Sequence, residues 1–496
     1  MSRKAPTVLS EDEVEVRPPF GKNPPKIGFV SLGCPKNLVD SEVMMGMLAH
    51  NGAELVRQAE DADIIVVNTC SFIESAQQES VNTILEMARH KTDGKARKLV
   101  VAGCLVERFR NDIQKNIPEV DAVVGTGELE NILAAAGLAP AQPADSPFRI
   151  LTSRPEGDAR AAQGRFSRES WNGNVSDLPN YLYDEATPRI LATPGYTAYI
   201  KIAEGCDHPC TFCIIPQLRG QFRSRRFESV VAEAERLALS GVREITLIGQ
   251  DTTCYGEDFD LKDGLALLLE KLASIDSLHW VRFLYAYPNK ITGRLLETIA
   301  SHENICSYMD VPLQHASPTV LKRMKRGGGA DIFLRSIEKM RRTIPDVTVR
   351  SSFIVGFPGE TEKEFEELCD FVREAKLDWM GAFSYSDQEG AGAFDLAKKL
   401  SPKEIERRRK YLMKIQQGIS RKSKKALIGK EFDLLLQGTS EESDLLYEGR
   451  TAMHAPEIDG KVFVNDFPED RKPQIGEFYR CEITEAHDYD LVARII

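Results

Sequence analysis

The chain has 496 residues, of which 42% are hydrophobic and 28% are charged, and its formal net charge is −11. These values are typical of a soluble globular protein of about three domains. No apolar stretch approaches the ~20 residues that a membrane span needs, so we expect no membrane partner. The acidic excess argues against generic nucleic-acid binding.

Residues 1–25 are rich in proline and acidic side chains, and they contain no apolar segment of the signal-peptide kind. We interpret them as a disordered tail. Without an export signal, the ten cysteines indicate a reducing compartment, the cytoplasm, and they favour metal ligation over disulfides.

Residues 26–137 alternate short apolar segments with helical patterns, which predicts a doubly wound parallel sheet. The expected strands cover 27–30, 64–67, 99–102 and 120–124. Helical patterns begin at 40 and cover 73–90, 105–116 and 128–137. Ligands of such sheets collect at the carboxyl ends of the strands.

A cysteine follows each of the first three strands, at Cys34, Cys70 and Cys104. Three thiolates at one sheet edge can hold an iron–sulfur cluster and leave one iron open. The alternative is three buried structural cysteines. Asn37 and Asn68 could bond to cluster sulfurs, although we favour helix capping for both.

Residues 138–193 are rich in proline and polar side chains, and we interpret them as a linker or surface insertion without assigned chemistry. Residues 194–425 then give a second strand–helix series and a trailing helix. The expected strands cover 197–203, 244–249, 279–285, 307–312, 347–355 and 379–384. The expected helices cover 227–240, 263–274, 291–301, 331–343 and 362–376. Six β/α units predict a partial (βα)6 barrel, whose function lies at the carboxyl ends of its strands.

Cys206, Cys210 and Cys213 directly follow the first barrel strand in a C-xxx-C-xx-C spacing. Three thiolates this close can ligate a 4Fe–4S cluster whose fourth iron stays open for a cofactor or substrate. One alternative is a zinc site completed by His208. A disulfide is the other, and it does not suit a reducing compartment.

Three strand-end loops should face these cysteines: 249–253, which contains Gln250, 312–315, and 356–361. The last begins Gly356-Phe357-Pro358-Gly359 and by itself also reads as a turn before an N-capped helix. The remaining candidates get no catalytic assignment, because packing or solvation explains each as well. These are His315, Arg219, Arg223 and Arg225, and the isolated Cys254, Cys306, Cys369 and Cys481.

Residues 401–425 predict one long basic helix, whose charges usually form a solvated face. Residues 426–496 predict a small β-barrel or sandwich with strands near 432–436, 462–464, 478–483 and 491–493. Positions 427–496 hold seven basic and sixteen acidic residues, a net charge of −9. Such a field repels phosphate and attracts a basic protein.

Two cysteine triads, a six-unit barrel and a small β-module together resemble the methylthiotransferases, which are radical S-adenosylmethionine (SAM) enzymes. The resemblance implies an α/β fold with a TRAM-like C-terminal barrel, and two 4Fe–4S clusters. The auxiliary cluster would use Cys34, Cys70 and Cys104, and the SAM cluster would use Cys206, Cys210 and Cys213. Gly356, Phe357, Pro358, Gly359 and Gln250 become candidates for SAM binding.

The segments 31–42 and 203–213 are most similar to the RimO-type branch, which modifies a ribosomal protein. The resemblance implies an aspartate of small-subunit ribosomal protein twelve as substrate, free or within the ribosome. Its β-carbon would lose hydrogen to a SAM-derived radical and gain a methylthio group from the auxiliary cluster. An electron donor is required, and no direct nucleic-acid substrate is expected.

Two other functions stay open. A tRNA adenosine methylthiotransferase of the MiaB or MtaB type is the first alternative, and the basic helix at 401–425 is its best support. A non-catalytic iron–sulfur protein that binds ribosomes or transfers electrons is the second.

Overall fold

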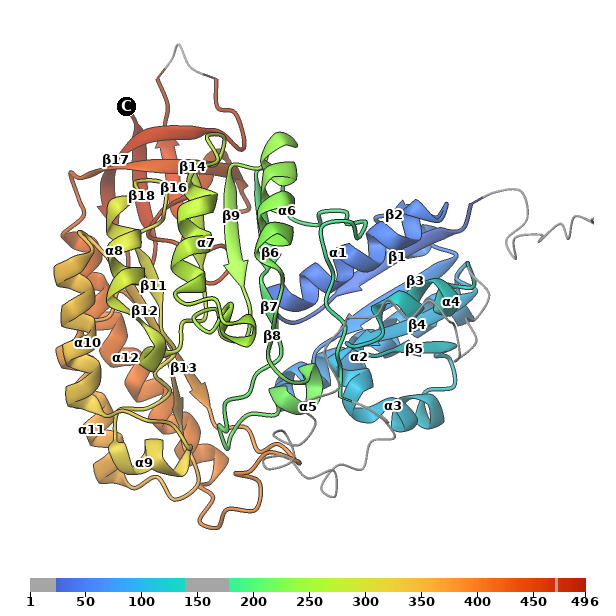
Figure 1. The fold of residues 1–496 in the computed structure, drawn as a ribbon, viewed down its shortest axis with the longest axis horizontal. Coiled ribbons are helices and arrows are strands. Elements are labelled where there is room, and N and C mark those ends of the chain that lie inside the picture. Colours follow the sequence, from blue (N-terminus) through green and yellow to red (C-terminus); the bar gives the residue numbers. More distant parts are fainter. Residues whose placement is uncertain (1–23, 139–177, 469–471) are drawn as a thin grey trace, which may run out of the picture.

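The computed structural model describes residues 24–138, 178–468 and 472–496. The tail at 1–23 and most of the predicted linker, 139–177, therefore lie outside the described residues. In the described part, a blue N-terminal sheet domain lies beside a central barrel, and a red C-terminal barrel covers one end of it (Figure 1).

The N-terminal domain has a parallel sheet with the strand order β2-β1-β3-β4-β5. Alternate residues of the central strand β3 face opposite layers. Ile64 and Val66 join the core with α1 and α4, whereas Ile65 and Val67 join the core with α2 and α3. This confirms the doubly wound sheet. Its elements are β1 (Lys26–Ser31), α1 (Pro35–His50), β2 (Glu54–Val56), β3 (Ile64–Thr69), α2 (Glu74–Thr92), β4 (Lys98–Gly103), α3 (Cys104–Asn116), β5 (Ala122–Val124) and α4 (Ile132–Ala136).

The four predicted strands of this domain are present, and the short edge strand β2 is an addition. Strand β2 has only three residues, which is too short for an alternating or continuous apolar pattern to mark it as a strand in the sequence.

The central barrel is open and has six parallel main strands, as predicted. They form two three-stranded sheets, β10-β9-β6 and β11-β12-β13, which a bridge between Val281 and Ile305 joins. The strands are β6 (Thr197–Lys201), β9 (Glu244–Ile248), β10 (Trp280–Phe283), β11 (Tyr308–Asp310), β12 (Thr348–Val355) and β13 (Trp379–Ser384). The outer helices are α6 (Phe227–Leu239), α7 (Gly264–Ala273), α8 (Gly293–Ser301), α10 (Ala330–Thr343) and α11 (Glu362–Ala375).

Four short elements of this region were not predicted: β7 (Ala203–Glu204), α5 (Ile215–Arg219), β8 (Arg223–Ser224) and α9 (Pro318–Arg323). In Figure 1, α5 lies against the N-terminal domain beside α3. It begins two residues after Cys213 and so connects the barrel's cysteine loop to the sheet domain.

Residues 178–193, the described end of the predicted linker, pack between α1 and α6. Arg189 forms salt bridges with Glu42 of α1, and at 2.6 Å with Glu233 of α6. Tyr183 is buried beside them. This end of the segment is therefore part of the interface between the sheet domain and the barrel.

The long helix α12 (Pro402–Lys425) packs against β13 and α11. Some of its arginines have acidic partners: Arg407 pairs with Glu362 and Glu404, and Arg409 pairs with Glu406. These ion pairs engage part of the positive charge of the helix.

The C-terminal module is a closed barrel with the strand order β14-β15-β16-β18-β17. Its strands are β14 (Glu431–Ser440), β15 (Ser443–Thr451), β16 (Val462–Asp466), β17 (Phe478–Ala486) and β18 (Leu491–Ile495). The sequence did not reveal β15, because its acidic and small residues interrupt the apolar alternation that marks a strand.

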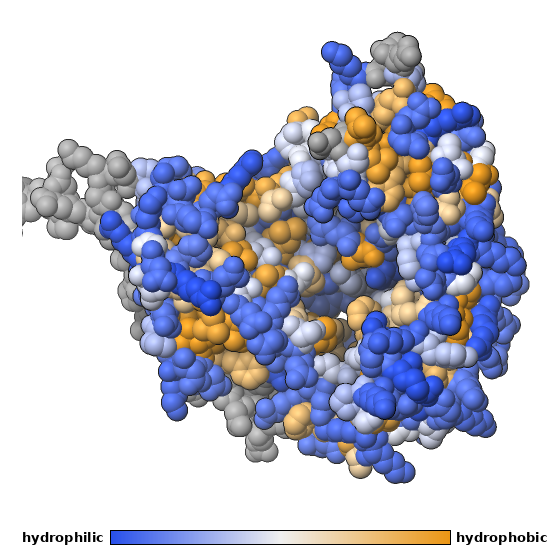
Figure 2. Space-filling model, turned by 180° about the vertical axis from the view of Figure 1, so that it is seen from behind, coloured by the Kyte–Doolittle hydropathy of each residue, from blue (hydrophilic) through white to orange (hydrophobic). Residues whose placement is uncertain are grey.

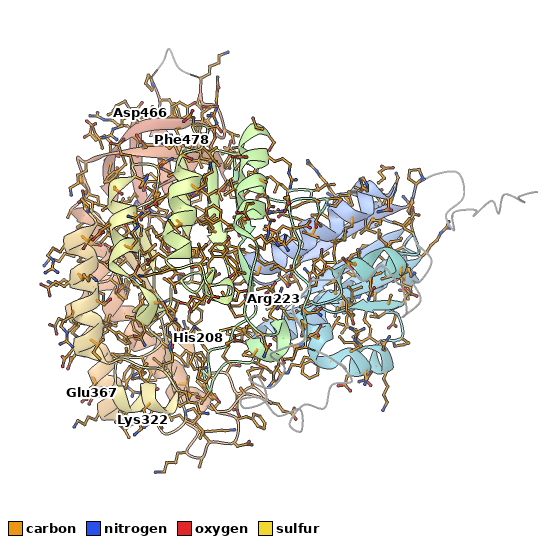
Figure 3. All side chains as sticks on the ribbon, viewed as in Figure 1. His208, Arg223, Lys322, Glu367, Asp466 and Phe478 are labelled. Atoms are coloured by element: carbon orange, nitrogen blue, oxygen red, sulfur yellow. The ribbon has the colours of Figure 1, made fainter. Side chains whose placement is uncertain are left out.

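The connection after β15 seats this module on the amino ends of the central strands. Arg450 Nη1 donates to Glu244 Oε1 at 2.9 Å, and Tyr308 donates to Asp459 at 2.6 Å. The indole of Trp379 donates to the carbonyl of Met453 at 2.7 Å. Figure 3 accordingly shows Asp466 and Phe478 at one end of the molecule and His208 toward the other.

No helix in the described ranges is both long and apolar enough to cross a membrane.

Candidate functional site

Cys34, Cys70 and Cys104 are placed by the ends of three neighbouring strands. Cys34 precedes α1, Cys70 follows β3, and Cys104 begins α3. A side chain at Gly33, where φ is +91°, would come within 2.8 Å of Cys70 Cβ and 3.1 Å of its Sγ. Only glycine allows the first turn to approach the second cysteine this closely.

The three thiols are close enough to influence one another's ionisation. Burial raises the pKa of Cys70, and the neighbouring Cys34 raises it further. Burial raises the pKa of Cys104 to about 12, while Arg219 opposes that shift. Burial therefore favours the neutral thiol form of Cys70 and Cys104, and a bound metal cluster would displace their protons.

Asn37 and Asn68 connect these turns instead of capping helices, so the capping interpretation was wrong. Asn37 donates to the carbonyls of Leu32 at 2.7 Å and Thr69 at 3.0 Å. Asn68 donates to the carbonyl of Asn37 at 2.8 Å. These hydrogen bonds connect the turns after β1 and β3, which hold Cys34 and Cys70.

Cys206, Cys210 and Cys213 lie in one loop after β7. Its backbone folds back on itself: the N–H of Cys206 donates to the carbonyl of Gly220, and that of Cys213 to the carbonyl of Cys210, both at 3.2 Å. Arg326 donates to Cys210 Sγ at 3.5 Å. Donors aimed at sulfur suit thiolate ligands of a cluster.

His208 does not complete a zinc site with these cysteines. It bonds to Asp251 at 2.6 Å and stacks on Tyr287 with the ring centres 3.9 Å apart. In the described ranges, only His208, Asp251 and Cys254 place three ligand atoms within 4.8 Å of one another. Neither cysteine triad is that tight, as it would be around a single zinc ion.

Helix α5 joins the two triads. It begins just after Cys213, whose Sγ accepts the N–H of Ile215 at 3.4 Å. Ile214 and Leu218 form a small buried apolar cluster with Cys104 of the other triad. One helical turn therefore connects the two cysteine sites through buried apolar contacts.

Arg219, at the end of α5, is buried in a charge network across the domain interface. Its guanidinium pairs with Asp40 and, at 3.2 Å, with Glu204, and it donates to Asn37 Oδ1 at 2.8 Å. Lys201 pairs with the same two carboxylates. Two cations and two anions balance, which makes the buried network tolerable.

The other two arginines of the loop are also engaged. Arg223, seen at the junction of barrel and sheet domain in Figure 3, donates to the carbonyl of Tyr181 at 2.8 Å. Arg225 pairs with buried Glu233. Both therefore act in the interface and are not free for a ligand.

The loop Gly356-Phe357-Pro358-Gly359 follows β12 at the same end of the barrel as the cysteine loop. The carboxylate of Glu360 accepts the N–H groups of Gly356 and Phe357. Gly356 has φ of +80°, and a side chain there would collide with Ile405. Thr361 then caps α11, as the N-capped reading predicted.

Gln250 lies beyond β9 and donates to Glu204 Oε1 through its amide nitrogen. In the part of the chain that the structure describes, its buried carbonyl oxygen has no partner. That oxygen can accept a bond from a ligand's amino group. His315, in contrast, is fully buried, and burial lowers its pKa to about 3. It is not placed to shuttle protons.

A further contact between the barrel and the sheet domain has no local signal in the sequence, because its residues lie far apart in the chain. Gln388, beyond β13, accepts bonds from Gln77 at 2.8 Å and Arg108 at 2.6 Å, both on the sheet domain. Figure 2 shows the molecule hollowed between its two lobes. The segment around Gln388, called the strap below, therefore connects the two lobes, the barrel and the sheet domain.

Three parts of the chain match known families. Residues 26–125 match Uncharacterized protein family UPF0004, residues 200–372 the Radical SAM superfamily, and residues 428–496 the TRAM domain. A protein of Koribacter versatilis named ribosomal protein uS12 methylthiotransferase RimO is 71% identical, with 95% of this chain and 97% of the relative covered. The chain belongs to the RimO family. A relative of the same name in Solibacter usitatus is 55% identical over 95% of each chain.

Among solved structures, the radical SAM methyltransferase TsrM of Kitasatospora setae matches this RimO-family chain with a TM-score of 0.51. The match covers 75% of this chain and 77% of TsrM at 14% identity. A likeness at that identity concerns the fold alone. It agrees with the sheet domain and the open barrel described above.

Proposed function

We propose that this radical SAM enzyme of the RimO family adds a methylthio group to the β-carbon of an aspartate in ribosomal protein uS12, the small-subunit protein twelve. Cys206, Cys210 and Cys213 hold the SAM-binding 4Fe–4S cluster, and Cys34, Cys70 and Cys104 hold a second one. The observation that carries the proposal is the pair of thiol triads held on either side of α5.

An aspartate β-carbon has an unactivated C–H bond, which the acid–base groups at this site cannot break. SAM and the clusters supply radical and sulfur-transfer chemistry when bound. The chain's own part is to orient and to exclude water. Gly356 to Gly359 and Gln250 would hold SAM, while Ile214 and Leu218 keep the space between the triads apolar.

The partners follow from charge. The C-terminal module's net charge of −9 favours a basic protein such as a ribosomal protein over RNA. The arginines of α12, the best support for a tRNA substrate, are largely paired with glutamates. An external electron donor and the reducing cytoplasm complete the proposal.

The experiment offers two substrates to anaerobically reconstituted protein with SAM and a reductant: uS12, free or in small subunits, and unmodified tRNA. Mass spectrometry then looks for one added methylthio group. A gain on an aspartate peptide supports the proposal. A gain on adenosine overturns the substrate assignment, and absence of 5′-deoxyadenosine overturns the radical mechanism.

A further inference from the structure

Lys36 is a buried lysine whose charge has no protein counter-ion in the described residues. The residue is 8% exposed. Its Nζ lies 3.4 Å from the carbonyl oxygen of Gly249 and 3.4 Å from the ring centre of Tyr285. An ammonium group has three N–H donors. In the described residues its neighbours are this carbonyl oxygen, at a long distance, the side chain of Tyr285 and the thiol of Cys34, and none of them is a carboxylate.

Other buried cations of the same interface are paired with carboxylates. Lys201 has Asp40 and Glu204, and Arg189 has Glu42 and Glu233. A buried charge is costly unless it is paired and hydrogen-bonded. The contrast indicates that Lys36 is prepared for an anion that does not belong to this chain.

Lys36 lies where the sheet domain meets the carboxyl end of a barrel strand, and an anion bound to it would lie at that interface. It lies in the first turn of α1, two residues after Cys34, and reaches across the domain interface to Gly249 at the carboxyl end of β9. Two residues beyond Gly249, Asp251 holds His208 of the other cysteine loop. The ammonium of Lys36 thus lies close in sequence to Cys34 and contacts the loop whose Asp251 bonds to His208 of the other cysteine loop.

Tyr285, which covers one side of the ammonium, is held in an unusual conformation. Its φ is +65°, a region that bulky residues rarely adopt, and its N–H donates to Asp310 at 3.0 Å. Strain of this kind persists where the surrounding structure enforces it, often at ligand sites. The ring holds the ammonium by a cation–π contact and leaves its unused N–H bonds for an anion.

We propose that Lys36 binds the side-chain carboxylate of the substrate aspartate. This rests on the proposed function, which makes an aspartate the substrate. The carboxylate carbon is bonded directly to the β-carbon, so holding the carboxylate also fixes the reacting carbon at this interface. Lys36 is then a substrate-positioning residue that selects an acidic side chain.

A competing role for Lys36 is to balance the charge of the cluster at Cys34. The two roles differ in what they predict for Lys36→Met, which removes the charge and keeps much of the side chain's length. If Lys36 serves the substrate, the iron content, the electron paramagnetic resonance spectrum and the reduction potential of the auxiliary cluster stay as in the wild type. If it serves the cluster, those properties shift.

The binding test uses reconstituted full-length protein and fluorescently labelled uS12, with the modified aspartate left intact or changed to asparagine. We expect the wild type to prefer the aspartate form by about ten- to hundred-fold, the usual worth of a hydrogen bond to a charged group. Lys36→Met should bind both forms equally weakly, and Lys36→Arg should recover part of the preference. Lys322→Met, at an exposed lysine of α9, is the control and should behave as the wild type.

The outcomes separate this proposal from the function on which it rests. If the wild type adds no methylthio group to uS12, the proposed function fails and takes this assignment with it. If the wild type modifies uS12 but binds the aspartate and asparagine forms equally, the assignment of Lys36 alone is overturned. The same holds if Lys36→Met keeps the preference while its cluster spectrum shifts. Should Lys36→Met not fold, the comparison of the two uS12 forms on the wild type still decides.

Discussion

The two cysteine triads are built in opposite ways. Cys206, Cys210 and Cys213 come from one short loop, whose backbone hydrogen bonds set their spacing. The other triad comes from the ends of β1, β3 and β4, so its geometry depends on the whole sheet. The first, local triad can be recognised in the sequence as a motif. The second, dispersed triad comes together only when the sheet domain has folded.

The two designs meet at α5. The helix belongs by sequence to the local triad, but Leu218 packs against Cys104 and Arg219 reaches Asp40 and Asn37 of the sheet domain. The dispersed triad is therefore completed by residues of the barrel.

The largest effect is expected from single cysteine substitutions, which distinguish the roles of the two triads. Cys210→Ala should abolish SAM cleavage, because it removes a ligand of the cluster that binds SAM. Cys70→Ala should spare some SAM cleavage and abolish sulfur insertion. Chromatography of 5′-deoxyadenosine and mass spectrometry of uS12 measure the two activities.

Cys369→Ala is the matched control for these substitutions, since Cys369 is buried in the barrel core and belongs to neither triad. It should retain both activities. Full activity in either triad variant would contradict the ligand assignments.

The next largest effect is expected at Arg219, because its removal leaves buried carboxylates short of a cation. Breaking one partner of a buried ion pair typically costs about 3–5 kcal/mol. Arg219→Met should therefore lower the thermal midpoint of the metal-free protein clearly, and Arg219→Lys should lower it less. Scanning calorimetry measures both.

Arg294→Met is the control for Arg219, because Arg294 pairs with Glu270 on the surface, where such pairs contribute little. If Arg219→Met were as stable as Arg294→Met, the interface network would not hold the barrel to the sheet domain. The dispersed triad would then depend on the sheet alone.

The sequence predicted the fold well because its main signals are local or periodic. The six barrel strands, the four long strands of the sheet and the helices after them follow from apolar runs and helical spacing. Both triads could be picked out, one from spacing and the other from the rule that ligands gather at strand ends. The RimO-family membership agrees with the motifs that surround them.

What the sequence could not show are contacts between residues far apart in the chain. Arginine and lysine usually lie on the surface, so the sequence does not show that Arg219 and Lys36 are buried at the domain interface. There Arg219 pairs with Asp40, whereas Lys36 has no carboxylate partner in the described residues. Gln388 meets Arg108 across a separation of 280 residues. Strand β15 was missed for a different reason, since its alternation is broken by acidic residues.

A smaller effect is expected from the strap that carries Gln388. Gln388→Ala removes one acceptor each from Gln77 and Arg108, which keep their bonds to the carbonyls of Ser71 and Glu389, and a lost hydrogen bond of this kind costs on the order of 1 kcal/mol. Hydrogen exchange should become faster in the first turns of α2 and α3, with the barrel unchanged. Gln78→Ala, at an exposed neighbour that bonds only to Asn82, is the control. Unchanged exchange in Gln388→Ala would mean that the strap does not hold the lobes together.

The last effect is a change of stability with pH, and it concerns Glu107, three residues after Cys104 in the dispersed triad's domain. Burial raises the pKa of its carboxyl to about 7, although the N–H of Thr126 opposes the shift; nearby Glu128 raises it and Arg110 lowers it. The folded protein therefore keeps a proton that the unfolded chain releases above its ordinary pKa of about 4.3.

Because the folded state holds the extra proton, the stability of the sheet domain should fall as pH rises from about 4.5 to 7 and then level off. Glu107→Gln keeps a side-chain oxygen for Thr126 and removes the titration, so its thermal midpoint should lack this slope and exceed that of the wild type by a few degrees at pH 8. Thermal melts of both proteins at pH 5, 6, 7 and 8 measure the difference. A wild-type slope that survives in Glu107→Gln would place the titrating group elsewhere, and burial of Glu107 would then not explain the pH response of the sheet domain.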